Sequence, residues 1–137
     1  AGAPEHVIEF FHGYTYSGHP VDCAAAVATL QLMKDEGLFA RAGTQGRVLG
    51  DAMHSALKGL PNVVSIRTLG LAGAVEVAPA AAGPGKRAYD IMLDCFHRGV
   101  WLRAAGDNIV LCPPYIVETA QIEQMVQTLA DSIRRHA

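Results

Sequence analysis

Two pairs of short strand-like segments constrain the fold of this chain more than any other feature. Segments 63–69 (VVSIRTL) and 72–77 (AGAVEV) are rich in residues that favour strands, and only a Gly-Leu dipeptide separates them. A second pair, 100–104 (VWLRA) and 108–112 (NIVLC), flanks the tripeptide Ala-Gly-Asp. Strands joined by such tight turns pair in antiparallel fashion. The pattern therefore predicts a small, mostly antiparallel sheet.

Helical segments surround these strand pairs. Pro20 suits the first turn of a helix, and Gly37 is a natural stop after it. Thr119 is the expected N-cap of the last helix. The expected helices cover 20–36, 38–57, 86–98 and the region from 119 to near the C-terminus. Helices on a small antiparallel sheet predict an α+β fold.

The spacing of apolar residues predicts which helix faces enter the core. The expected core positions are Leu38, Ala42, Leu49, Met53 and Leu57, then Tyr89, Met92, Leu93 and Phe96, and finally Ile122, Met125, Val126, Leu129 and Ile133. Gly43, Gly46 and Gly50 are expected to weaken the second helix by roughly 1 kcal/mol each relative to alanine.

Composition excludes several classes of protein. Of the 137 residues, 50% are hydrophobic and 18% are charged, which supports a packed core rather than disorder. The net charge of −2 gives no electrostatic reason to expect nucleic acid or an anionic membrane as a partner. No apolar run is long enough to span a bilayer.

The cysteines and the N-terminal histidines predict neither a disulfide framework nor a metal site. The three cysteines lack a CxxC pair, and we expect reduced thiols that act as small hydrophobes in a cytoplasmic protein. The residues that could form an N-terminal metal site match no zinc spacing; they are His6, His12, His19 and Cys23.

The segment HGYTYSGHP, residues 12–20, is the first candidate for function. Backbone N–H groups at the start of a helix favour an anion such as phosphate, and Thr15 and Ser17 add hydroxyl donors. Gly13 and Gly18 allow the backbone to approach a ligand closely. A turn whose hydroxyls simply cap the helix explains the same residues equally well.

Arg103 is the second candidate. It alternates with Trp101 on one face of the expected strand, and a guanidinium group can hold a carboxylate through two parallel hydrogen bonds. A solvated arginine on an edge strand is the alternative, and Arg67 and Arg98 compete for the same role. The spacing alone does not separate the three.

Other polar residues receive no catalytic role from the pattern. Asp107 follows a glycine and is expected to form a turn. Lys34, Lys58 and Lys86 lie in polar surroundings, and none has the apolar environment that suits Schiff-base chemistry.

Three longer segments carry a family resemblance. They are FFHGYTYSGHPVDCAAAVATLQLMKDEGL, VVSIRTLGLAGAVEV and CFHRGVWLRAAGDNIVLCPPYIVETAQIEQM. Together they resemble the C-terminal third of class III pyridoxal-phosphate-dependent aminotransferases, closest to the β-alanine–pyruvate (omega-amino acid–pyruvate) branch. The likeness runs from about Val7 to the end of the chain.

The resemblance implies a domain assignment. Residues 1–36 would be a remnant of the large cofactor-binding domain of a fold-type I enzyme, with the phosphate loop and the connecting helix. Residues 37–137 would form its C-terminal small α/β domain. The lysine that binds the cofactor would lie upstream, so we expect this chain to hold no catalytic residue and to be inactive alone.

The resemblance also implies site residues and partners. Tyr14 and Thr15 would bind the phosphate of pyridoxal 5'-phosphate in the active site of the partner subunit of a homodimer, or of a tetramer. Arg103 would bind the substrate carboxylate and swing away for donors that lack one. The implied reaction moves an amino group from an omega-amino acid or amine, such as β-alanine, to pyruvate. Alternatives are a class III aminomutase, decarboxylase or racemase, or a free-standing small-molecule-binding α+β domain.

Overall fold

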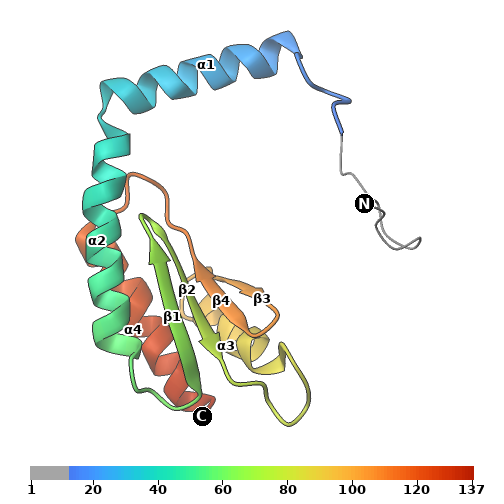
Figure 1. Ribbon diagram of the computed structural model, residues 1–137, viewed down its shortest axis with the longest axis vertical. Coiled ribbons are helices and arrows are strands. Elements are labelled where there is room, and N and C mark those ends of the chain that lie inside the picture. Colours follow the sequence, from blue (N-terminus) through green and yellow to red (C-terminus); the bar gives the residue numbers. More distant parts are fainter. Residues whose placement is uncertain (1–12) are drawn as a thin grey trace, which may run out of the picture. The chain divides into compact units, whose positions relative to one another are not determined.

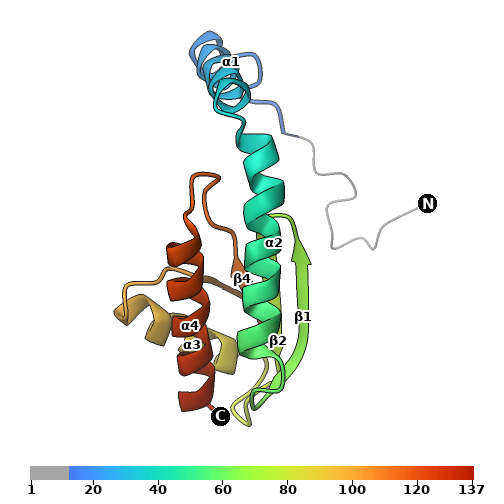
Figure 2. The ribbon, with the colours of Figure 1, turned by 90° about the vertical axis from the view of Figure 1, so that its left-hand side faces the viewer.

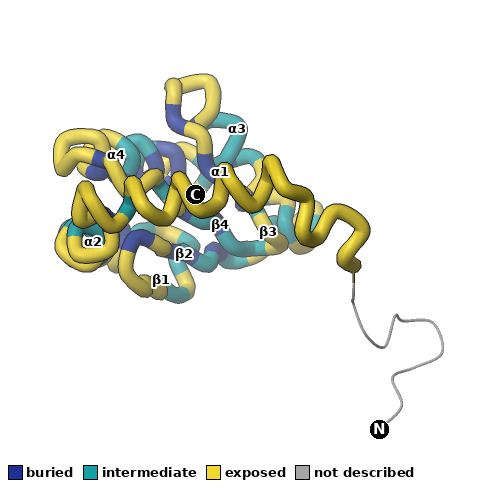
Figure 3. The backbone as a smooth tube through the Cα atoms, turned by 90° about the horizontal axis from the view of Figure 1, so that it is seen from above, coloured by how far each residue is buried: buried dark blue, intermediate teal, exposed yellow. Residues whose placement is uncertain are grey.

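The computed structural model describes residues 13–137, and the chain divides into two compact units, Ala1–Glu36 and Gly37–Ala137. The described part of the first unit contains α1 (Pro20–Asp35), with Pro20 in its first turn as expected. The backbone N–H of Glu36 closes the helix on the carbonyl of Leu32 at 2.9 Å. Within its own unit α1 buries none of its residues (Figure 3).

The second unit contains a four-stranded antiparallel sheet (Figure 1). Its strands are β1 (Val63–Leu69), β2 (Ala72–Val77), β3 (Arg103–Ala105) and β4 (Asn108–Leu111), in the order β1-β2-β4-β3. The α+β architecture is thus confirmed. β3 begins three residues later than expected, because the backbone N–H of Val100 donates to Cys95 in the turn that ends the preceding helix.

Three helices cover one face of this sheet. They are α2 (Leu38–Leu57), α3 (Lys86–His97) and α4 (Thr119–Arg135). α2 packs on β1 and β2, α3 packs on β3 and β4, and α4 packs against both of these helices (Figures 1 and 2). The largest fully buried side chains come from the helices and from alternate strand positions: Leu49, Met53, Leu57, Val75, Val77, Ile91, Ile109, Leu111, Ile122, Val126, Leu129 and Ile133.

For α2 and α4, most of the residues expected in the core are buried, so the expected core faces are confirmed. For α3 the expected core face is wrong. Tyr89 and Phe96 are 51% and 49% exposed, whereas Ala88, Ile91 and Cys95 are completely buried. The buried face of α3 carries two small residues, which let the helix lie close to its neighbours. The sequence-based prediction favoured large apolar side chains and therefore assigned the adjacent face, with Tyr89 and Phe96, to the core.

Gly46 has a packing role that the helix pattern did not indicate. A Cβ atom at this position would lie 2.4 Å from the carbonyl carbon of Gly70, in the turn between β1 and β2. The backbone of α2 therefore touches the backbone of this turn, and no side chain fits between them.

The start of α4 also differs from the prediction. Glu118, rather than Thr119, is the N-cap, and it forms a capping box with Gln121. Arg41 of α2 donates to the carbonyls of Tyr115 at 3.1 Å and Val117 at 2.8 Å, and to the Glu118 carboxylate at 3.2 Å. These tertiary contacts fix the segment before α4, so Glu118 rather than Thr119 takes the N-cap position.

Candidate functional site

The face of the sheet opposite the helices carries most of the polar side chains of the strands, except Thr68, which lies near Gly50 of α2. We call it the open face and define it by Ser65, Arg67, Leu69, Ala72, Ala74, Glu76, Arg103, Ala105, Asn108 and Val110. In the register of the sheet, Arg67 pairs with Ala74, Ala74 with Val110, and Val110 with Arg103. The two arginines therefore share one row of the sheet and lie on its two edge strands.

Arg67 is held by its neighbours on the open face. Its Nη1 donates to the Ser65 hydroxyl at 3.0 Å and to the Glu76 carboxylate at 3.3 Å. Its Nη2 donates to the side-chain oxygen of Asn108, and the Ser65 hydroxyl donates to Glu76 at 2.8 Å. Arg67 thus has its hydrogen-bonding capacity directed at protein partners, which disfavours it as a binding group for a substrate carboxylate.

Arg103 has no such partners. Its side chain is exposed and makes no hydrogen bond or ion pair within residues 13–137. The preceding residue, Leu102, is 2% exposed and anchors the strand in the core. Arg98 also lacks a partner in the described part of the chain, but it is the C-cap of α3, where a positive charge suits the helix dipole. Arg103 is therefore the strand arginine available to bind a planar anion.

The turn before α1 contains the two predicted phosphate-binding residues. The backbone N–H of Ser17 donates to Tyr14 at 3.0 Å, and that of His19 donates to Tyr16 at 3.2 Å. The turn is exposed, and among the described residues the hydroxyl of Thr15 has no hydrogen-bond partner. No side chain of the described residues caps the first turn of α1. A turn of this kind can donate to one edge of an anion but does not enclose it.

The predicted site residues fall in both units. Tyr14 and Thr15 belong to the first unit, and Arg103 belongs to the second. Because the two groups of residues belong to different units, the phosphate-binding site and the carboxylate-binding site remain two separate predictions. His6 and His12 lie outside the described residues, and among residues 13–137 no cluster of His, Cys, Asp and Glu could hold a metal ion.

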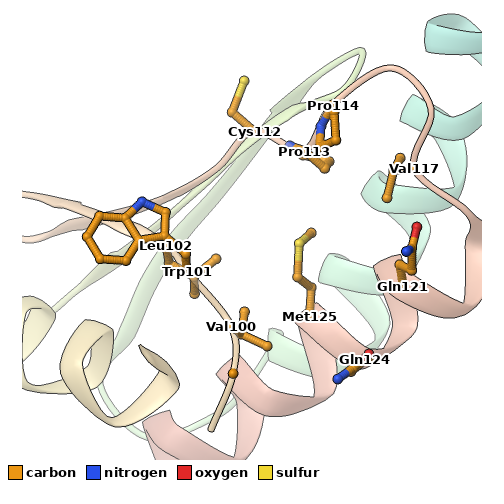
Figure 4. A pocket seen from close by; sticks show the side chains of 11 residues that line it. Val100, Trp101, Leu102, Cys112, Pro113, Pro114, Val117, Gln121, Gln124 and Met125 are labelled. Atoms are coloured by element: carbon orange, nitrogen blue, oxygen red, sulfur yellow. The ribbon is translucent and has the colours of Figure 1, made fainter. Parts of the chain in front are cut away.

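A pocket of about 410 Å³ opens beside the C-terminal end of α3 (Figure 4). Trp101, Leu102, Cys112, Gln121 and Met125 are among its lining residues. Trp101 is 73% exposed, and its ring meets that of Phe96 edge-on at 5.4 Å between centroids. Among residues 13–137, no Asp, Glu, His, Lys or Arg lines the pocket, so no described residue there is a base that could activate the Cys112 thiol.

The remaining thiols and the lysine amines differ in their exposure. Burial raises the pKa of the Cys95 thiol, whose Sγ lies 3.3 Å from the Ser132 hydroxyl, so it is a structural cysteine. The sequence predicts that the cysteines act as small hydrophobic residues. This is confirmed for Cys95, which is buried, but is wrong for Cys23 and Cys112, which are exposed. All three lysines are exposed as well, and Lys86 pairs with Asp90 at 2.6 Å.

Sequence reasoning missed the partners of Arg67, although a signal was present. A two-residue turn at 70–71 places residue 67 opposite 74 and residue 65 opposite 76. Arg67, Ser65 and Glu76 could therefore have been assigned to one face from the sequence. The contribution of Asn108 could not, because it depends on how the two hairpins pair.

No helix among residues 13–137 is both long enough and apolar enough to cross a membrane.

Comparisons with known proteins agree with the fold and the motifs. The family model described as Aminotransferase class-III matches residues 1–133. An omega-aminotransferase of Caulobacter vibrioides is 45% identical over 122 residues, which cover 89% of this chain and 28% of that protein. A beta-alanine–pyruvate aminotransferase of Pseudomonas aeruginosa is 32% identical over 130 residues, which cover 95% of this chain and 29% of that protein.

Solved structures show the same relationship. An omega transaminase from Pseudomonas jessenii, solved in complex with PMP, matches with a TM-score of 0.82 and 30% identity. The match covers 91% of this chain and 29% of that chain. This chain thus spans between a quarter and a third of the length of the curated relatives it matches.

Proposed function

The chain belongs to the class III aminotransferase family, and we propose that it is part of a longer enzyme that transfers an amino group to pyruvate. The amino donor is an omega-amino acid or amine, such as β-alanine. The observation that carries the proposal is the family match over residues 1–133, together with 45% identity to an omega-aminotransferase. The matched relatives are more than three times as long, so the activity belongs to the longer protein.

The cofactor of this family is pyridoxal phosphate, and the first unit fits one part of it, the phosphate group. The hydroxyl of Thr15 is exposed and has no partner within residues 13–137, and the turn that carries it leads into the N-terminus of α1. We assign the Thr15 hydroxyl and N–H and the Tyr14 N–H to the phosphate. When bound, the cofactor supplies the electron sink that makes the carbon beside the amine acidic.

The substrate carboxylate is assigned to Arg103. Its guanidinium group is exposed on the open face, whereas Arg67 on the same row is bound to Ser65, Glu76 and Asn108. A free guanidinium group can form two parallel hydrogen bonds to a carboxylate and still move aside for a donor that has none.

The group that removes the proton from the carbon beside the substrate amine is assigned to the amine of a lysine outside this chain. Lys34, Lys58 and Lys86 are exposed and distant from an apolar enclosure. The 137-residue chain alone should therefore have no aminotransferase activity. In the longer protein, we propose that two subunits associate, each lending Tyr14 and Thr15 to the site of its partner.

The first experiment tests the reaction itself in the longer protein. With pyridoxal phosphate bound, β-alanine should bleach the cofactor's visible absorption band, and pyruvate should restore it. A band that forms but does not cycle would indicate different chemistry within the family. Absence of any protein-bound band would contradict the cofactor assignment.

The second experiment tests Arg103. In Arg103→Ala, kcat/KM for pyruvate should fall about 100-fold, as expected for a lost charge-assisted pair. The value for propanal, an acceptor without a carboxylate, should stay within about threefold. Arg47→Ala is the matched control, since Arg47 is exposed and has no partner among the described residues. Equal losses for both acceptors would remove Arg103 from the substrate site.

The third experiment tests Thr15. Thr15→Ala should weaken cofactor binding about tenfold while turnover at saturating cofactor is retained, because one hydrogen bond to the phosphate is lost. Thr15→Ser keeps the hydroxyl and should bind the cofactor nearly as well. Unchanged affinity in the alanine variant would exclude Thr15 from the phosphate site.

A further inference from the structure

Asp107 lies in the turn between β3 and β4 and joins three parts of the second unit. Its backbone carbonyl accepts a hydrogen bond from the N–H of Val77, at the end of β2, at 2.9 Å. Its carboxylate accepts one from the N–H of Gly85, directly before α3, at 2.7 Å. The turn is thereby fixed both to the sheet and to the start of a helix.

Gly85, the partner of the Asp107 carboxylate, also lies in van der Waals contact with the turn itself. Gly85 has a φ of 78°, and a Cβ atom there would lie 3.5 Å from the carbonyl oxygen of Gly106. Gly85 is the N-cap of α3 and has no side chain to satisfy the helix start. Asp107 supplies a carboxylate at this end from outside the helix, where the helix dipole favours a negative charge.

Arg103 lies between two anchors of the same short strand. β3 has three residues and pairs only with β4, so it is an edge strand with little support of its own. On one side of Arg103, the Leu102 side chain is buried in the core. On the other side, the strand runs into the turn that Asp107 holds. The backbone is thus held on both sides of Arg103.

We propose that Asp107 is a positioning residue for Arg103: it fixes the β3–β4 hairpin so that the guanidinium group is directed at the substrate carboxylate. This inference rests on the proposed role of Arg103. Removing the Asp107 carboxylate leaves the backbone bond to Val77 in place. The hairpin therefore still forms, but its turn is no longer tied to the start of α3.

The test measures selectivity between two acceptors in the longer protein with pyridoxal phosphate bound. The readout is kcat/KM for pyruvate divided by kcat/KM for propanal. In Asp107→Ala this ratio should fall about tenfold, because a misplaced binding group loses much of its contribution. Asp107→Asn keeps a side-chain oxygen that can accept from Gly85, so its ratio should stay within about twofold of the wild type.

Asp51→Ala is the matched control. Asp51 is exposed on α2 and has no hydrogen bond or ion pair among the described residues, so its loss should leave the ratio unchanged. A merely structural role for Asp107 would lower the rates with both acceptors equally. An unchanged ratio in Asp107→Ala would therefore overturn the inference.

A double-mutant cycle separates this inference from the role of Arg103. In an Arg103→Ala background, Asp107→Ala should cause no further fall in the ratio, because Asp107 acts only through Arg103. A further fall of the same size would show an independent role and overturn the inference. If Arg103→Ala alone leaves the ratio unchanged, the proposed carboxylate site fails, whatever Asp107 does.

Discussion

On the helix-covered face of the sheet, Val75 and Ile109 are completely buried, whereas on the open face their sequence neighbours Glu76 and Val110 remain partly exposed. The same strands supply both faces, since successive side chains point to opposite sides. The covered face is held by apolar packing, and the open face carries Arg67, Glu76 and Arg103. Residues for binding can therefore change on one face without disturbing the core on the other.

The largest expected effect breaks the covered face. Ile109→Ala in the 137-residue chain should lower the free energy of unfolding by about 3 kcal/mol, because it leaves a cavity in the core. Val110→Ala, one residue later on the open face, should cost about 1 kcal/mol or less. Urea denaturation of both variants measures the difference. Equal losses would show that the open face is packed as tightly as the covered one.

The second prediction tests how closely α2 approaches the covered side. Gly46→Ala should destabilise the chain by about 2 kcal/mol, because its methyl group would collide with the backbone of Gly70. Gly43→Ala lies on the same helix with open space around it, and should stabilise the chain by up to about 1 kcal/mol. Thermal unfolding of the pair measures both. A stabilising Gly46→Ala would refute the close contact.

The third prediction sharpens the difference between the two arginines of the open face. Glu76→Gln weakens the network around Arg67 and should cost about 1 kcal/mol, since both side chains are partly exposed to solvent. Arg103→Ala should change the unfolding free energy by less than about 0.5 kcal/mol, as it removes no contact with a described residue. A comparable loss in Arg103→Ala would contradict the view that only Arg67 is structural.

The smallest effect concerns an ion pair on the helical side. Burial opposes ionisation of Asp94, but the Ser132 hydroxyl and Arg135 at 2.6 Å outweigh it, so the pKa of Asp94 is lowered from its usual 3.8. A lowered native pKa stabilises the fold above pH 4, and this contribution is lost as the pH falls through the native pKa.

Asp94→Asn should therefore cost about 0.5 kcal/mol at pH 7, because the pair is partly exposed, and less at pH 2. Urea denaturation at the two pH values measures the change, with Asp51→Asn as the unpaired control. A loss that is the same at both pH values would mean that the charge of Asp94 is not involved.

Local signals in the sequence determined most element boundaries and the fold class. Pro20 and Gly37 bound the first helix, and the Gly-containing turns at 70–71 and 106–107 define the two hairpins. These signals are local because they depend on backbone conformations that a few neighbouring residues set by themselves. The motifs also carried the family resemblance, which the family match confirmed.

Only the tertiary structure decided which side chains are available for function and which face of α3 is buried. Arg67 is bound by Glu76 and Asn108, from two other strands, while Arg103 is left without a partner in the described chain. The face of α3 with Ala88, Ile91 and Cys95 enters the core because its small residues permit close packing. The spacing of large apolar residues in the sequence does not reveal this. Asp107 gains a role beyond its turn only because Gly85, 22 positions away in sequence, is brought to its carboxylate. Such contacts depend on how separate elements meet, and local sequence does not encode that geometry.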